Sequence, residues 1–129
     1  RLALADIALD TFHHAGGVTT TDALWAGVPV LTLLQDDMID RMGASLLTAA
    51  HLPELIATSV DNYVERALTL QKNRGSLDEL KTRLISSYKT APLFDTPRLA
   101  KDIEVAYEAI WHAHINGNKP KILRPDIKN

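Results

Sequence analysis

Apolar residues along the chain form short unbroken runs first and helical stripes afterwards. The run at residues 28–34 lacks polar alternation, which is typical of a strand covered on both faces. From residue 59 onward, apolar positions recur every three or four residues, which indicates helices that bury one face. The pattern predicts strands at 4–12, 28–34 and 52–57, a short helix from residue 19 or 20 to 26, and helices at 40–50, at 60–72, from 76 and from 97 to near 117.

Capping residues indicate where these helices begin and end. Ser59 is placed to cap the helix that follows it, and Ser76 with Glu79 forms a capping box. Thr96 stands before a proline, which suits an N-cap followed by the first helical position. Gly27 fits the residue just beyond the C-terminus of the first helix.

The alternation of strands and helices predicts an α/β fold, a Rossmann-like parallel sheet with a helical C-terminal flank. We expect residues 1–129 to form a single domain, because 129 residues suit one packed core. The chain opens at Arg1 inside an apolar pattern, so we expect it to be a fragment of a longer polypeptide.

Composition narrows the function classes. Hydrophobic residues at 46% and charged residues at 23% are ordinary for a globular domain. A net charge of −2 favours neither a nucleic-acid nor a membrane partner, and no apolar run approaches the ~20 residues that span a bilayer. The absence of cysteine excludes disulfides, thiolate zinc sites and a cysteine nucleophile, and it fits a cytoplasmic location.

The candidate chemistry lies between the first strand and the first helix. Gly16 and Gly17 let the backbone approach a phosphate, and the N–H groups of the first helical turn have no partner inside the helix. Thr19, Thr20 and Thr21 add hydroxyl donors. This turn follows the carboxyl end of a strand, where α/β sheets bind their ligands, so we predict an anion site.

Polar residues around the turn have more than one interpretation. Asp22 either accepts hydrogen bonds from a ribose diol or complements the helix dipole. His13 and His14 diverge as neighbours, so at most one faces a ligand, and we take His14 as the candidate contact to sugar or phosphate. Acidic residues 36, 37 and 40 share one loop, where solvation is the ordinary state, and we predict no metal site.

Several segments in register resemble the protein O-GlcNAc transferase family and its tetratricopeptide-linked bacterial members. They cover essentially the whole chain, which makes the resemblance specific. The segments are DIALDT at 6–11, GGVTTTDALWAGVPV at 16–30, RMGASLL at 41–47, ELIA at 54–57, PLFD at 92–95, the region 107–111 and GNKP at 117–120.

The resemblance implies a GT-B glycosyltransferase, in which two Rossmann-like halves face a cleft, and residues 1–129 are its C-terminal, donor-binding half. The implied reaction is inverting transfer of N-acetylglucosamine from UDP-GlcNAc to a Ser or Thr hydroxyl of a protein, with no essential metal and no cofactor. It implies that an N-terminal Rossmann half and tetratricopeptide repeats precede this chain, and we assign the catalytic base to residues outside it. The implied diphosphate-binding residues are Gly16, Gly17, Val18, Thr19 and Thr20, with Asp22 on the ribose and Arg1 near the nucleotide.

Two departures from the family pattern keep alternatives open. Val18 stands where relatives usually have Thr, so its amide remains but a hydroxyl contact to phosphate is lost. Residues 13–15 border the sugar and differ from the usual sequence, which leaves the donor sugar open. The alternatives are a GT-B relative that uses GDP-fucose, a nucleotide-sugar epimerase, and a non-catalytic α/β interaction domain.

Overall fold

The computed structural model of the chain describes residues 1–119. Its internal packing divides the chain into two compact units, Arg1–Phe94 and Asp95–Asn129. The first holds the sheet and the candidate site. The second is, over its described residues, one long helix. The expectation of a single half-domain over residues 1–129 stays a prediction.

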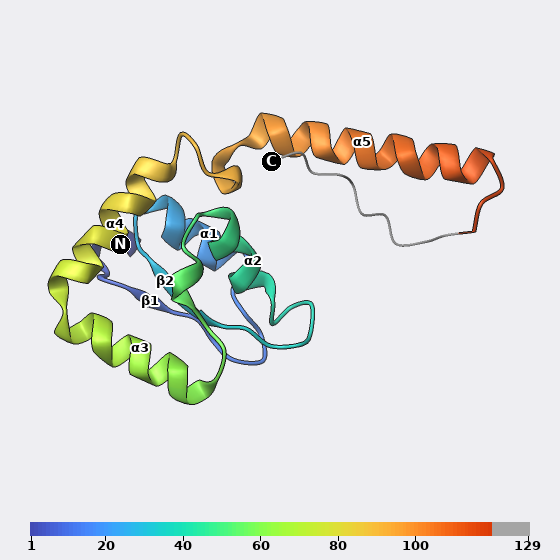
Figure 1. Ribbon diagram of the computed structural model, residues 1–129. Coiled ribbons are helices and arrows are strands. Elements are labelled where there is room, and N and C mark those ends of the chain that lie inside the picture. The colour runs from blue at the N-terminus through green and yellow to red at the C-terminus, as the bar shows by residue number, and fades with distance from the viewer. Residues whose placement is uncertain (120–129) are drawn as a thin grey trace. The chain divides into compact units, whose positions relative to one another are not determined.

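A three-stranded parallel sheet forms the centre of the first unit, in the order β1-β2-β3 (Figure 1). The strands are β1 (Ala8–Leu9), β2 (Val30–Leu33) and β3 (Ile56–Ala57). Ala8 pairs with Val30, and Thr32 pairs with Ile56. All four residues of β2 are buried, as the lack of polar alternation predicts for a central strand. The Rossmann-like α/β prediction is confirmed.

Helices cover both faces of this sheet. α1 and α2 lie on one face, and α3 lies on the other (Figure 1). Both crossovers, β1 to β2 and β2 to β3, advance in the same direction, which places their helices on the same face. The helices of the first unit are α1 (Val18–Trp25), α2 (Met42–Ala49), α3 (Val60–Lys72) and α4 (Arg74–Ser87), with 3-10 turns η1 (Leu2–Leu4), η2 (Pro53–Leu55) and η3 (Pro92–Phe94).

Successive residues of β2 feed two separate hydrophobic clusters. Val30 joins the larger cluster, which includes Leu24 of α1, Leu47 of α2 and Leu84 of α4. Residues 31 and 33 point the other way, where Tyr63 of α3 completes a smaller cluster. The sheet is therefore held from both sides, and the strand ends that carry the site are fixed.

The first strand is shorter than predicted. Residues 4–12 were expected to be extended throughout, but Leu2–Leu4 is a 3-10 turn and only Ala8–Leu9 forms ladder contacts. Leu4 is 89% exposed, so this apolar run has no partner layer to bury it. The carboxylate of Asp6 instead pairs with Arg74 at 2.8 Å and Lys81 at 3.2 Å, both on α4.

Two cap predictions are confirmed. The Ser59 hydroxyl accepts a hydrogen bond from the amide of Asn62 at the start of α3. Gly27 has a φ of +76° just after α1, and its amide and that of Val28 donate to the carbonyls of Leu24 and Ala23. This pair of bonds is the usual end of a helix at a left-handed glycine.

Two other caps lie one to three residues earlier than predicted. α4 starts at Arg74 because the Asn73 side chain accepts from the amide of Ser76, so the expected capping box at Ser76 is wrong. The second unit's helix, α5 (Thr96–Ile115), is capped by Asp95, which accepts from Arg98, and not by Thr96. In both helices an Asn or Asp precedes the predicted cap and can accept the same kind of bond.

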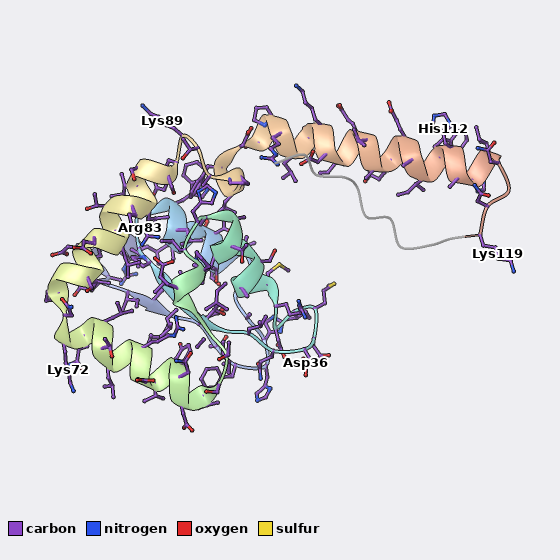
Figure 2. All side chains as sticks on the ribbon, viewed as in Figure 1. Asp36, Lys72, Arg83, Lys89, His112 and Lys119 are labelled. Atoms are coloured by element: carbon purple, nitrogen blue, oxygen red, sulfur yellow. The ribbon has the colours of Figure 1, made fainter. Side chains whose placement is uncertain are left out.

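Surface charges tie α4 to the rest of the first unit. Arg83, labelled in Figure 2, pairs with Glu54 of η2 at 2.5 Å. This contact joins α4 to η2, and the ion pairs of Asp6 with Arg74 and Lys81 join α4 to the segment before β1. These exposed pairs contribute little free energy individually.

Candidate functional site

The turn between β1 and α1 lies at the carboxyl end of β1. α1 begins at Val18 with Gly17 as its N-cap, two or three residues earlier than the predicted cap at Thr19 or Thr20, and no side chain is bonded to the helix end. The first amide of this region that bonds within the protein backbone is that of Thr21, which donates to the Gly17 carbonyl. Within residues 1–119, the N–H groups of residues 17–20 donate to no protein atom. They are available to an anion.

Two threonine hydroxyls gather above Gly16. A Cβ built on Gly16 would lie 2.6 Å from Oγ1 of both Thr19 and Thr20, so glycine leaves the space that these hydroxyls occupy. Thr19 is exposed, whereas Thr20 is 3% exposed. Thr21 does not join them, because its hydroxyl donates back to the Gly17 carbonyl at 3.0 Å.

A small cavity of about 180 Å³ opens beside this turn. Its polar lining is Asp10, Thr19 and Thr20, and its apolar lining comes from η1, β1, α1 and β2. The turn is therefore not packed shut. A second, wider hollow of about 760 Å³ lies between α2 and the loop after β2, and Arg41 contributes to its lining.

Asp10 supports the turn from below. Its Oδ1 accepts hydrogen bonds from the amides of Gly16 at 2.8 Å and Thr11 at 3.0 Å, and its Oδ2 accepts from Oγ1 of Thr32 at 2.7 Å. The hydroxyl of Tyr63 donates to the Asp10 carbonyl at 2.9 Å. One residue thus links β1, the turn, β2 and α3.

The pKa of the Tyr63 hydroxyl is raised, first by burial and then by the negative charge of Asp10. Tyr63 therefore stays protonated well beyond neutral pH and keeps its hydrogen to donate. Its ring also contacts Phe12 edge-on, with centroids 5.0 Å apart. The loop that leads into the turn is fixed from the α3 side.

The other predicted site residues lie around the turn. Asp22 is exposed on the fifth residue of α1, beyond its first turn, which weakens the interpretation that it only complements the helix dipole. Val18 is 76% exposed at the helix start. His14 and Arg1 are also exposed, and the His14 carbonyl accepts from the Thr11 hydroxyl.

Sequence reasoning missed the residues that hold the turn from behind. Asp10 enters the sequence analysis only within the segment DIALDT, and Thr32 is not among its candidate residues. Gly43 of α2 was not singled out, although a Cβ there would lie 2.5 Å from both Asp10 Oδ2 and Thr32 Oγ1. The available signals in the sequence were a threonine inside an otherwise apolar strand and an aspartate near the end of the preceding strand.

Both tryptophans of the chain lie at helical stripe positions that would suit a core, but both are exposed. Trp25 is 54% exposed and packs on Tyr88 and Phe94, with ring centroids 5.4 and 4.7 Å away. Trp111 is 61% exposed on α5. No residue of α5 is buried.

Residues 1–119 contain neither a group of side chains suited to a metal ion nor a membrane-spanning helix. No group of three or more His, Asp or Glu side chains there could hold a metal ion, and Asp36 projects from the loop after β2 (Figure 2). No helix in the same range is long and apolar enough to cross a membrane.

Comparison with known proteins identifies close relatives. Residues 1–103 match the model of the family described as Glycosyl transferase family 41. A probable UDP-N-acetylglucosamine–peptide N-acetylglucosaminyltransferase SEC from Arabidopsis thaliana is 40% identical over 99% of this chain. A probable enzyme of the same description, SPINDLY from Eustoma exaltatum subsp. russellianum, is 35% identical over 97%.

A solved structure is similar as well. A mutant Thermobaculum terrenum O-GlcNAc transferase superposes with a TM-score of 0.77 and 37% identity over 82% of this chain. The chain spans 14% of the length of either plant relative and 20% of the bacterial chain.

Proposed function

The chain belongs to glycosyl transferase family 41, and we propose that it is the donor-binding part of a longer enzyme that glycosylates proteins. The donor is UDP-GlcNAc, and the acceptor is a Ser or Thr hydroxyl. The relatives' descriptions as UDP-N-acetylglucosamine–peptide transferases support this donor and acceptor class. Their greater length supports a whole enzyme that contains much more than this chain.

The turn at residues 16–20 carries the proposal. Four amides with no protein acceptor and two hydroxyls lie at the carboxyl end of a parallel strand, beside an open cavity. Backbone N–H groups at a helix N-terminus bind phosphate oxygens, and the helix dipole adds positive potential there. We assign the donor diphosphate to Gly16, Gly17, Val18, Thr19 and Thr20.

In our proposal the nucleoside and the sugar lie on opposite sides of the diphosphate that is bound at residues 16–20. Asp22 projects from α1 one turn beyond the diphosphate amides, and an ionised carboxylate can accept hydrogen bonds from both ribose hydroxyls. His14, on the loop before the turn, and Arg1, at the start of η1, are further candidates for contact with sugar or nucleotide.

The remaining machinery is assigned outside this chain. An inverting transfer needs a base for the acceptor hydroxyl and charge neutralisation for the departing diphosphate. We propose that an N-terminal Rossmann half supplies the facing wall of the cleft, that tetratricopeptide repeats precede it, and that the enzyme acts in the cytoplasm without a metal or cofactor.

Calorimetric titration of the full-length protein tests the donor assignment. We expect binding of UDP and UDP-GlcNAc, with UDP preferred over GDP. A preference for GDP would favour the GDP-fucose alternative. Failure of both nucleotides to bind at millimolar concentration would refute a donor site here and leave the non-catalytic interaction domain.

Asp22→Ala tests the ribose contact. Loss of hydrogen bonds to a charged group should cost at least ~1 kcal/mol, or about fivefold in UDP affinity. Asp78→Ala is the matched control, because Asp78 is also exposed and is also the fifth residue of its helix, α4. Equal UDP affinity in both variants would remove Asp22 from the site.

A further inference from the structure

We propose that Asp10 is the positioning residue of the donor site: it holds Gly16 and thereby keeps residues 17–20 in the conformation that presents their amides to the diphosphate. The inference rests on the proposed function, because it concerns the same turn. Asp10 precedes the turn by six residues and touches it through Gly16.

The hydrogen bonds of Asp10 are all directed into the protein. Oδ1 receives the amides of Gly16 and Thr11, and Oδ2 receives the hydroxyl of Thr32, at 2.7 to 3.0 Å. Three donors on two oxygens leave little capacity for a ribose, an acceptor hydroxyl or a cation. The geometry therefore fits a supporting role rather than a catalytic one.

Two glycines leave space for the carboxylate of Asp10. A Cβ on Gly43 would lie 2.5 Å from Oδ2, and a Cβ on Gly16 would lie 3.3 Å from Oδ1. The fully buried Thr32 hydroxyl has its hydrogen-bond partner in Asp10. Glycine on α2 and glycine in the turn thus both leave room for Asp10.

The loop that Asp10 closes is strained and tightly connected. His13 has a φ of +61°, a conformation that costs energy for a residue with a side chain. The Thr11 hydroxyl donates to the His14 carbonyl at 2.7 Å, and the Asp10–Gly16 bond closes the loop. Without that bond, the Gly16 amide loses its acceptor and the turn is free to relax.

The negative charge of Asp10 opposes binding of the diphosphate at the adjacent turn. A carboxylate beneath a diphosphate repels it, so the charge is tolerated for the sake of the hydrogen bonds. Asparagine keeps the two backbone bonds without the charge, because its oxygen can accept from the amides of Gly16 and Thr11. The third bond reverses: the asparagine NH₂ group donates to the Thr32 oxygen, and the Thr32 hydroxyl hydrogen loses its acceptor. Asp10→Asn should therefore preserve the site, and Asp10→Ala should not.

The test compares UDP with uridine in the full-length protein, since only UDP carries the diphosphate. We expect Asp10→Ala to weaken UDP binding by about tenfold or more, because bonds to a charged acceptor are lost, and to change uridine affinity less than twofold. Asp10→Asn should bind UDP within about threefold of the wild type. An equal loss for UDP and uridine, or an Asp10→Asn variant as weak as Asp10→Ala, would overturn the proposal.

Thr32→Val provides a second variant if Asp10→Ala does not fold. It removes one donor from Oδ2 with little change in shape, and it should weaken UDP binding about two- to fourfold while sparing uridine. Unchanged UDP affinity would count against the proposal.

Amide hydrogen exchange separates this inference from the proposed function, since it needs no ligand. In unliganded protein, the Gly16 and Thr11 amides should exchange faster in Asp10→Ala, or in Thr32→Val if Asp10→Ala does not fold, and at near the wild-type rate in Asp10→Asn. If wild-type protein binds no UDP, the proposed function fails while this result still decides whether Asp10 holds the turn. Unchanged exchange in the variant tested would refute that role.

Discussion

The two adjacent glycines of the turn should respond differently to alanine. A Cβ on Gly16 would lie 2.6 Å from Oγ1 of Thr19 and of Thr20, about 0.8 Å short of the 3.4 Å at which ordinary contact begins. A Cβ on Gly17 would meet only Met42 Cγ, at 3.7 Å. Sequence alone gives no reason to distinguish these neighbours, so the difference is a test of the geometry.

The expected cost of Gly16→Ala follows from which side chain can move. Thr19 is exposed and can rotate away, but Thr20 is 3% exposed and has little room. Forcing an extra methyl into a packed site costs about 1–3 kcal/mol. For a unit of this size, each kcal/mol lowers the thermal midpoint by roughly 4–8 °C. Gly17→Ala should cost less than about 1 kcal/mol, the ordinary effect of alanine at an N-cap.

Donor binding gives a second measurement of the same perturbation. Moving the Thr19 or Thr20 hydroxyl takes a donor away from the diphosphate, so Gly16→Ala should also weaken UDP binding by about threefold or more. Thermal and urea denaturation measure the stability, and calorimetry measures the affinity. If Gly16→Ala and Gly17→Ala lose equal stability, or if Gly16→Ala leaves both quantities unchanged, the described packing of the turn is wrong.

Two further predictions concern stability away from the turn. Gly27→Ala should cost about 1–2 kcal/mol in urea denaturation, because its φ is +76°, whereas Gly75→Ala, in the first turn of α4, should leave stability equal or higher; equal losses would refute this. Hydrogen bonds from Arg74 and then Lys81 hold the pKa of Asp6 below its ordinary 3.8, so the stabilisation by Asp6 is present above that value and is lost as pH falls through the lower folded-state pKa. Asp6→Asn should therefore lower the thermal midpoint at pH 7, less so in high salt, and the difference from wild type should vanish in strong acid.

The order of strands and helices was predictable from the sequence, because apolar runs and helical apolar stripes indicate different elements. The run at 28–34, apolar except for Thr32 and lying between two predicted helices, indicates a central strand, and β2 is buried throughout. Strand ends were less predictable, because an apolar run says nothing about whether a covering layer exists. Leu4 is the example: it continues the pattern of β1, yet it is 89% exposed.

The candidate site divides in the same way. Gly16, Gly17 and the threonines are recognisable because local backbone chemistry alone makes them an anion turn. Asp10, Thr32 and Gly43 are separated by at least ten residues from one another and meet only when the sheet and α2 pack together. Tertiary contacts of that kind leave no periodic trace in a single sequence.

If the turn binds a sugar nucleotide as proposed, its charge balance leaves part of the catalytic task to another element. The N-terminus of a helix supplies roughly half an elementary charge, and Asp10 beneath it subtracts from that potential. Within residues 1–119, the cavity beside the turn has no Lys or Arg in its lining. Neutral amides and hydroxyls can therefore anchor a diphosphate, but they offset only part of the negative charge that it gains as a leaving group. In the proposed enzyme a cationic group would come from another element, and the candidates are Arg1 and the proposed N-terminal half.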